Sequence, residues 1–473
     1  MNVVDVLARS SGRPHEVAIV GPGGAWSYAE LAARVDARAA ELGSGAPGAA
    51  GAREGGGRSV AASVVPTVVS PDVASIVELL ALWRTGVVPA PLNARLTTAE
   101  EAGARARLAS GSVPAGTQVV LWTSGTSGRP RGIALSWANL DAITRASEER
   151  LGLGVGDVWV ASLSPAHVGG LVLIVRSLLL GGALLVPGAI DAASLSKLLD
   201  AGMGETGRGA LVPTHVSLVP TQLHRVLELR GARGAPPGLR CALIGGAHAP
   251  ASLLTRALEA GWPVALTYGA TEMSSQIATA PPDLVRAKPG TVGPPVRGVE
   301  VAVSPDGEVL ARGGTLALGS IGADVPPLAD ERGWYHSGDL GRIDDDGHLW
   351  ITGRRIDRIV SGGVTVDAVE VEEAIRTHPG VGDVCVVGLP DPEWGERVGA
   401  WVEPAPLLGD ADGSSGAPAT PDALAEHLRE RVGGAKMPRV WRVSPGLPRN
   451  PNGKVDRVAV RSVLAEVRAT PTL

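Results

Sequence analysis

Short apolar runs alternate with stretches of helical periodicity from residue 117 to about residue 300. A run of strand length followed by an amphipathic stretch is the unit of an α/β domain, so this region predicts a largely parallel sheet. Two further helices are predicted upstream, at 28–42 and 73–85. The predicted strands are 158–163, 182–186, 241–244 and 264–267.

The pattern changes after residue 299 to short strands separated by Asp-Gly turns, at 306–307 and 346–347, which predict hairpins. A separate unit with predicted helices at 369–377 and 422–432 and a buried strand at 384–388 then follows. We therefore expect a large multi-subdomain N-terminal α/β domain, residues 1–355, and a small mobile α+β C-terminal domain, residues 356–473. Segments 43–57 and 404–421 are rich in Gly, Ala, Ser and Pro and are predicted loops.

Composition narrows the class of protein. A chain of 473 residues with 44% hydrophobic positions predicts a globular enzyme with more than one core. A formal charge of −5 gives no reason to expect a nucleic-acid partner, and no apolar run is long enough to span a membrane. The two cysteines are far apart and the N-terminus lacks a secretion signal, so we expect a cytoplasmic protein. The oligomeric state stays open, with a homodimer as one alternative.

A segment rich in glycine and hydroxyl residues follows a predicted strand at 119–122 and precedes a helix predicted to begin near Ser136. Small residues let backbone N–H groups approach phosphate oxygens, and hydroxyl groups add donors. The segment is not a P-loop, since the required lysine followed by Ser or Thr is absent. By itself it could equally be a flexible linker. It reads Thr123-Ser124-Gly125-Thr126-Ser127-Gly128-Arg129-Pro130-Arg131-Gly132.

Two segments place oxygen ligands near predicted strands. Tyr268-Gly269-Ala270-Thr271-Glu272 directly follows an apolar run, where a hydroxyl and a carboxylate can meet a phosphate and its Mg²⁺. The second, residues 334–339, ends in Asp339, which can accept hydrogen bonds from a ribose diol. Each segment taken alone would be read as an ordinary turn.

Two further segments supply cations. Arg354 and Arg355 stand at the proposed domain junction beside Asp357, where exposed charges are usually only solvated. Lys454 follows a Pro/Asn/Gly turn near the C-terminus, in a chain whose other lysines are Lys197, Lys288 and Lys436. A lysine on a tight loop can enter a cleft as a mobile point charge for a phosphoryl oxygen or a carboxylate.

In this order and spacing, the five segments resemble those of the adenylate-forming superfamily of acyl-CoA synthetases, peptide-synthetase adenylation domains and luciferases. The resemblance covers residues 27–457. It implies that a carboxylate attacks the α-phosphate of ATP to give an acyl-adenylate and pyrophosphate, after which a thiol such as CoA displaces AMP. Charge neutralisation and positioning would then carry most of the catalysis, with Mg²⁺ as the cofactor.

The resemblance also implies roles for individual residues. Lys454, Thr271 and Arg354 would be catalytic, Glu272 would bind the metal, and Asp357 would be the hinge of the small domain. A thiol channel would be lined partly by Gly362 and Gly363. The ATP site would comprise Thr123, Ser124, Gly125, Thr126, Ser127, Gly128, Arg131, Gly245, Gly246, Ala247, Tyr268, Gly269, Thr271, Asp339 and Arg354.

Some positions depart from the superfamily pattern. Arg131 stands where a lysine is usual, which keeps the charge but changes its geometry. Ile356 replaces the first acid of a common Asp-Asp pair, and residues 364–367 differ from the usual sequence after the double glycine. The last departure bears on the detail of thiol binding rather than on adenylate formation.

Within the superfamily, the chain is similar to the o-succinylbenzoate–CoA ligases of menaquinone biosynthesis. The similarity lies in Ser274-Ser275-Gln276-Ile277, in the spacing to Lys288-Pro289-Gly290, and in residues 167–170 followed by Arg176-Ser177. An aromatic dicarboxylate needs a flat apolar wall and a donor for its unreacted carboxylate. Candidate acyl-substrate residues are His167, Gly245, Ser274, Ser275 and Gln276, each of which could equally be structural.

Three alternatives stay open. The chain could be another aryl- or acyl-CoA ligase, or an adenylation enzyme that loads a carrier protein. It could also be a non-catalytic nucleotide-binding homologue, although Glu272, Asp339 and Lys454 are all retained. His215, His224 and His248 are interpreted as surface or loop-stabilising residues rather than catalytic ones.

Overall fold

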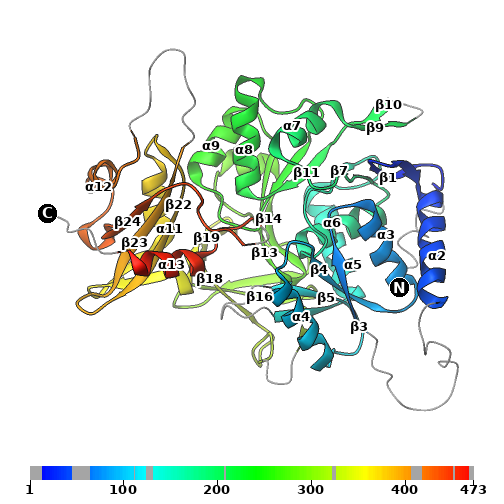
Figure 1. Ribbon diagram of the computed structural model, residues 1–473, viewed down its shortest axis with the longest axis horizontal. Helices are drawn as coiled ribbons and strands as arrows, with labels where there is room; N and C mark the ends of the chain where they lie inside the picture. The colour runs from blue at the N-terminus through cyan, green and yellow to red at the C-terminus, as the bar shows by residue number, and fades with distance from the viewer. Residues whose placement is uncertain are drawn as a thin grey trace.

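The computed structural model describes residues 13–44, 64–110, 112–123, 131–206, 209–321, 326–405, 418–450 and 453–467. A large domain, blue to yellow-green in Figure 1, adjoins a smaller C-terminal domain in yellow to red. Ser124, Gly125, Thr126, Ser127 and Gly128 lie outside the described residues, as do most of the predicted loops at 43–57 and 404–421.

An eight-stranded sheet forms the centre of the large domain. Its inner strands run parallel to their neighbours, whereas both edge strands pair antiparallel. The largely parallel sheet is therefore confirmed, with antiparallel edges that the pattern did not predict. In spatial order the strands are β14 (Ser275–Ala280), β13 (Val264–Ala270), β12 (Cys241–Ile244), β11 (His215–Leu218), β7 (Val158–Val160), β8 (Ala183–Leu185), β1 (Val17–Gly21) and β2 (Gly24–Ser27).

Alternate residues of each central strand pack on opposite faces of this sheet. On β12, Cys241 and Leu243 belong to one hydrophobic cluster, while Ala242 and Ile244 belong to the other. This period of two buries both faces, which is why the strands read as continuous apolar runs. One face is covered by α5 (Trp137–Leu151) and α6 (Val168–Leu179), and the other by α7 (Ala192–Ala201), α8 (Pro220–Arg230) and α9 (Ala251–Glu259).

The glycine-rich segment joins two antiparallel strands, β5 (Thr117–Thr123) and β6 (Arg131–Ser136), which form a smaller sheet with β17 (Gly319–Ser320). The sequence pattern missed β6 and placed the loop directly before a helix. The helix itself was predicted correctly: Ser136 ends β6 and caps α5 through a reciprocal bond pair with Asn139.

Other elements complete the large domain. The strands β3 (Val64–Val69) and β4 (Val88–Asn93) form a parallel pair and are connected through α3 (Val73–Arg84). Asp72 caps the N-terminus of α3. The remaining elements are α2 (Tyr28–Ser44), α4 (Thr98–Ser110), β9 (Met203–Thr206), β10 (Gly209–Leu211), η2 (Gly231–Arg233) and α10 (Pro282–Ala287).

An antiparallel sheet follows in the chain, formed by β15 (Val299–Val303), β16 (Glu308–Gly313), β18 (Tyr335–Ile343) and β19 (Leu349–Arg354). Both predicted hairpins are confirmed. Gly307 and Gly347 take φ angles of +87° and +78°, which the Asp-Gly turns require.

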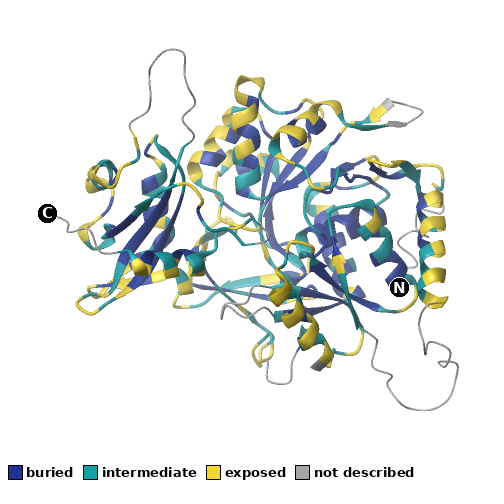
Figure 2. Ribbon diagram, viewed as in Figure 1, coloured by how far each residue is buried: buried dark blue, intermediate teal, exposed yellow. Residues whose placement is uncertain are grey.

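The C-terminal residues build a second core. A five-stranded sheet comprises β20 (Arg358–Ser361), β21 (Val364–Asp367), β22 (Val381–Asp391), β23 (Gly395–Pro404) and β24 (Val440–Val443). It packs against α11 (Ala368–Arg376), α12 (Pro421–Arg429) and α13 (Arg457–Glu466), with η5 (Gly434–Lys436) between the last two helices. Figure 2 shows buried strands inside each domain and exposed helical faces outside. Within the described residues, every helix is too short or too polar to cross a bilayer.

Candidate active site

The site begins at the carboxyl ends of the parallel strands, where the loops after β12 and β13 open toward the small domain (Figure 1). Gly245 follows β12 and packs so closely that a Cβ there would lie 2.6 Å from Cγ2 of Thr267. Gly246 takes a φ angle of +79°. Both positions therefore require glycine, which leaves the backbone of this loop accessible to a ligand.

Asp339 is the centre of a cluster that unites three predicted ATP-site residues. Its carboxylate accepts a hydrogen bond from the Tyr268 hydroxyl at 2.8 Å and forms an ion pair with Arg354 Nε at 2.9 Å. Asp339 and Arg354 are register partners on β18 and β19, while Tyr268 comes from β13. Burial and the neighbouring Asp339 charge raise the pKa of Tyr268 well above its usual value, so Tyr268 stays protonated and donates to Asp339.

Charges from several elements converge on Tyr335. Burial raises its pKa far above the usual value, the carboxylates of Glu272 and Asp339 raise it further, and the cations Arg354 and Arg131 oppose them. Glu272 lies in η3 (Thr271–Met273), directly after β13, and is half-buried. A carboxylate in this position fits the preference of Mg²⁺ for oxygen ligands.

The strand ends on either side of the glycine-rich loop carry unused donors. Thr123 Oγ1 and Arg131 Nε are buried, and neither finds a hydrogen-bond partner among the described residues. A buried polar atom normally has a partner, so these atoms fit a ligand with several acceptor oxygens, such as a polyphosphate.

Lys454 reaches the site from the small domain. An ideal Cβ built on Gly246 would lie 3.6 Å from Lys454 Cε and 3.7 Å from its Nζ. The lysine stands on a turn in which its own N–H donates to Asn450 Oδ1 at 3.1 Å and Gly453 takes a φ angle of +78°. The structure thus brings the C-terminal lysine to the loop after β12.

The electrostatic surroundings of Lys454 lower its pKa to about 8. Desolvation is the largest cause, repulsion from Arg354 adds to it, and attraction to Asp339 partly offsets both. Lys454 is exposed to solvent, while the protein atoms around it still displace part of the hydration of its ammonium group.

The predicted acyl-substrate residues divide into two groups. The Ser274 hydroxyl donates a hydrogen bond to the Thr315 carbonyl at 2.6 Å. The Gln276 amide donates to the Thr279 hydroxyl at 2.7 Å and accepts a hydrogen bond from the Ser147 hydroxyl. Ser274 and Gln276 therefore both make hydrogen bonds inside the fold. Ser275 is half-buried, and its hydroxyl has no hydrogen bond among the described residues. His167 is half-buried at the N-cap position of α6.

The turn that carries these serines is strained. Ser274 and Ser275 take φ angles of +56° and +118°, the only positive values at non-glycine positions in the part of the chain described. Such backbone angles cost about 1–3 kcal/mol each and cluster at ligand sites. Gly269 faces this turn, and a Cβ there would overlap the Ser275 carbonyl oxygen.

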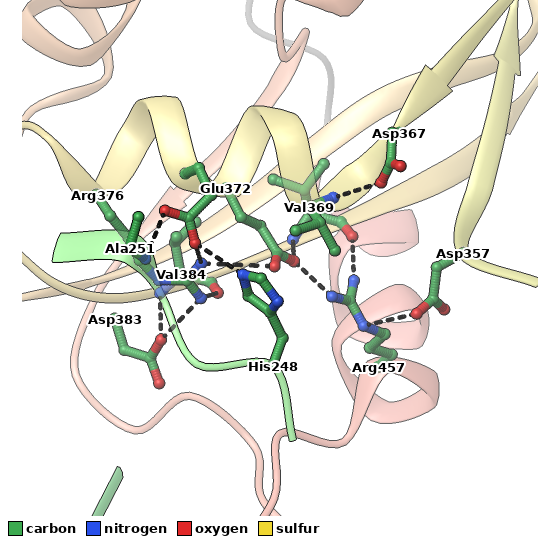
Figure 3. A network of polar contacts seen from close by, with 12 residues as sticks. His248, Ala251, Asp357, Asp367, Val369, Glu372, Arg376, Asp383, Val384 and Arg457 are labelled. Carbon is green, nitrogen blue, oxygen red and sulfur yellow. Dashed lines mark hydrogen bonds and ion pairs between the residues drawn. The ribbon is translucent and has the colours of Figure 1, made fainter. Parts of the chain in front are cut away.

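The expected hinge and thiol-channel residues lie in different surroundings. Asp357 ends η4 (Arg355–Asp357) and pairs with Arg457 Nε at 3.1 Å, as Figure 3 shows. Burial raises the Asp357 pKa, although Arg457 and Arg354 oppose this. Gly362 and Gly363 are exposed on the turn between β20 and β21; a Cβ on Gly363 would meet nothing within 4 Å. The structure does not bring them to the Lys454 cluster.

One sequence interpretation needs correction. His215 is not a surface residue: it is buried in β11 and stacks on Trp159 with ring centroids 4.6 Å apart. Arg176, part of the similarity to the succinylbenzoate ligases, is buried at the end of α6 over the same tryptophan, 4.1 Å from the ring centroid. Both lie near the amino ends of β7 and β11, opposite the edge that carries the site.

His248 does more than stabilise its loop. Its Nε2 lies 3.0 Å from Glu373 Oε1, and these residues belong to different domains. The sequence carried no signal for Glu373, because the two residues are 125 positions apart.

Comparison with known proteins identifies the family of the chain. A family model described as "AMP-binding enzyme" matches residues 104–322, and one described as "AMP-binding enzyme C-terminal domain" matches 370–454. A 2-succinylbenzoate–CoA ligase from Bacillus cereus is 34% identical over 358 residues, which cover 74% of this chain and 70% of the relative.

Solved structures share the fold. The o-succinylbenzoate CoA synthetase (MenE) from Bacillus subtilis, in complex with the acyl-adenylate intermediate OSB-AMP, superposes with a TM-score of 0.82 at 24% identity over 99% of both chains. The same enzyme in complex with ATP and magnesium ion gives a TM-score of 0.79 at 23% identity, covering 98% of this chain and 99% of that one.

Proposed function

Since the chain belongs to the AMP-binding family of adenylate-forming enzymes, we propose that it ligates o-succinylbenzoate to CoA, with cleavage of ATP to AMP and pyrophosphate. The observation that carries the proposal is the position of Lys454 against Gly246, beside the Asp339–Arg354 pair. The names of the relatives support the choice of acid. The resemblance of the sequence motifs supports a place for the reaction in menaquinone biosynthesis.

In the first step, a carboxylate oxygen of the acid attacks the α-phosphorus of ATP, and the bond to the pyrophosphate oxygen breaks. Two anions approach each other, so the chain must supply positive charge and hold both groups in line. Lys454 bridges the attacking carboxylate and the α-phosphate, while Thr271 contacts that phosphate. Glu272 would hold Mg²⁺, which would supply positive charge to the phosphates.

The nucleotide is held by the large domain. Asp339 accepts the ribose hydroxyls, and Tyr268 and Arg354 fix the orientation of its carboxylate. Thr123 and Arg131 flank the loop that receives the β- and γ-phosphates, and their unused donors support this role. The loop of Gly245, Gly246 and Ala247 lines the adenine and acyl pockets.

In the second step, the CoA sulfur attacks the acyl carbon, the acyl–phosphate oxygen bond breaks, and AMP leaves. The small domain rotates about Asp357, withdraws Lys454 and brings Gly362 and Gly363 to the site as part of the thiol channel. Both glycines are exposed in the present arrangement, so they are available to form a new contact after rotation.

The second carboxylate of o-succinylbenzoate needs a donor. Ser275 is a better candidate than Ser274 or Gln276, because those two side chains already make hydrogen bonds inside the fold, and His167 stays a candidate beside it. The left-handed backbone at Ser275 supports a ligand role for this turn.

The use of ATP and CoA as substrates favours the cytoplasm as the location of the protein.

The test is mass spectrometry of the products formed with Mg-ATP, CoA and o-succinylbenzoate, with benzoate and medium-chain fatty acids in parallel. We expect AMP and a CoA thioester from o-succinylbenzoate alone. A thioester from another acid would overturn the substrate assignment, and an acyl-adenylate without a thioester would point to a different thiol acceptor. No product from any acid would overturn the enzymatic proposal.

A further inference from the structure

Glu373 joins the small domain to the large one near the nucleotide loop. It lies on α11, and its carboxylate meets His248 Nε2 at 3.0 Å. Its other oxygen accepts the N–H of Ala251, the first residue of α9, at 3.3 Å. Pro250, at the N-cap position of α9, makes no side-chain bond to the helix. Glu373 therefore supplies from the other domain the acceptor that this helix end lacks.

The surroundings of Glu373 favour its charged form. Burial alone would raise its pKa, but His248, Arg376 and the Ala251 N–H outweigh burial and lower the pKa below its usual value. Arg376 Nη1 lies 3.7 Å from the same carboxylate, one turn along α11. The anion thus meets a helix N-terminus and an imidazole across the domain boundary, as Figure 3 shows for His248 and Ala251 beside α11.

This contact and the Lys454 contact reach the same loop of the large domain. His248 stands two residues after Gly246, which lies against Lys454. On the small-domain side, Glu372 binds Arg457 Nη2 at 2.7 Å, and Arg457 follows Lys454 by three residues. A rotation that carries Lys454 away from Gly246 therefore also separates Glu373 from His248 and Ala251.

We propose that Glu373 is a positioning residue for the first half-reaction: it holds the small domain in the arrangement that places Lys454 at the nucleotide loop. This inference rests on the proposed two-step function. Because rotation of the small domain would break the contacts of Glu373 with His248 and Ala251, Glu373 shifts the balance of domain arrangements toward adenylate formation and does not assist the thiol step.

The first test compares the two half-reactions in Glu373→Gln. We expect acyl-adenylate formation to fall about three- to tenfold, a size set by one partly exposed ion pair and one helix cap. Transfer from preformed adenylate to CoA should stay within about twofold or become faster. Glu228→Gln is the control, since Glu228 pairs with Arg256 at 2.7 Å within the large domain and its substitution makes the same change of charge without touching the domain boundary.

A double-variant cycle isolates the contact. His248→Ala should slow adenylate formation in the native background and have little further effect in Glu373→Gln, because the partner is already lost. Equal losses in both half-reactions for Glu373→Gln, or additive losses in the double variant, would overturn the proposal.

A third readout does not depend on chemistry. Fluorescent labels on Leu229→Cys and Val360→Cys, both exposed and in different domains, report the interdomain distance, while the native Cys241 and Cys385 are buried. Glu373→Gln should broaden or shift this distance distribution and Glu228→Gln should not. An unchanged distribution overturns the positioning role. A shifted distribution in a protein that makes no thioester would leave it standing and reject the proposed function instead.

Discussion

The two halves of the site are held in place by different means. Asp339, Arg354 and Tyr268 lie on paired strands of the large domain, so the surrounding sheets set their geometry. Lys454 lies on a short turn of a domain with its own core, and the polar contacts of Glu373 tie that core to the large domain.

This difference matches the two chemical steps. AMP stays bound to the acyl group until the thiol attacks, so the nucleotide-holding residues are needed throughout. The charge of Lys454, which bridges the attacking carboxylate and the α-phosphate, is needed only in the first step. We therefore expect that substitution of a residue held by strand pairing in the large domain slows both half-reactions. Substitution of a residue that the small domain brings to the site should slow only one.

Lys454→Ala should give the largest difference between its effects on the two half-reactions. We expect acyl-adenylate formation to fall about 100- to 1,000-fold, the usual cost of losing one preorganised charge-stabilising group. Thioester formation from preformed adenylate should stay within about threefold. Single-turnover assays measure both rates, and Lys436→Ala, a lysine paired with Glu370 within the small domain, is the control.

Asp339→Asn should affect both half-reactions. The change removes the charge that Arg354 and Tyr268 hold in place, and a hydrogen bond to a charged group contributes about 1.5–3 kcal/mol. We expect nucleotide affinity to fall about ten- to one-hundredfold in either step, as measured by titration with ATP and with AMP. A loss confined to one step would break the contrast between the domains.

Asp357→Pro should slow the second half-reaction rather than the first. Proline fixes φ at the residue proposed as the hinge, so the thiol step should slow by about tenfold or more while adenylate formation changes little. Asp357→Ala is the companion variant, because it removes the Arg457 ion pair without fixing the backbone. If the two variants behave alike, the ion pair rather than the hinge explains the effect.

The pH dependence of adenylate formation should be the smallest effect. The ammonium of Lys454 has its pKa lowered to about 8, so the active charged form is lost as the pH rises through that value. We expect kcat/KM for adenylate formation to decline above about pH 8 and the thiol-transfer step not to follow it. Lys454→Arg should keep its charge and move the decline to higher pH; an unchanged profile in this variant would assign the titration to another group.

Local patterns predicted much of the fold. The parallel strands, the Asp-Gly hairpins and the start of α5 at Ser136 depend on nearby residues, and all were predicted correctly. The strand β6 was missed because Arg131-Gly132 reads as the end of a loop, and only pairing with β5 makes it a strand.

Parts of the site depend on contacts between distant residues and could not be predicted. Gln276 is occupied by Ser147, 129 positions away, and Glu373 meets His248 across a domain boundary. No spacing rule indicates that Ser275 takes a left-handed backbone or that Arg176 faces the opposite edge of the sheet. In each case the sequence identifies the residue, but it does not predict which distant residue contacts it.

The most direct test of the contrast is the ratio of the two half-reaction rates, measured on Lys454→Ala and Asp339→Asn preparations alongside the native protein. Acyl-adenylate formation is followed from ATP and o-succinylbenzoate, and thiol transfer from purified adenylate and CoA. We expect the ratio of the first rate to the second to fall about 100-fold or more in Lys454→Ala and to stay nearly unchanged in Asp339→Asn. The same ratio in both variants would contradict this expectation.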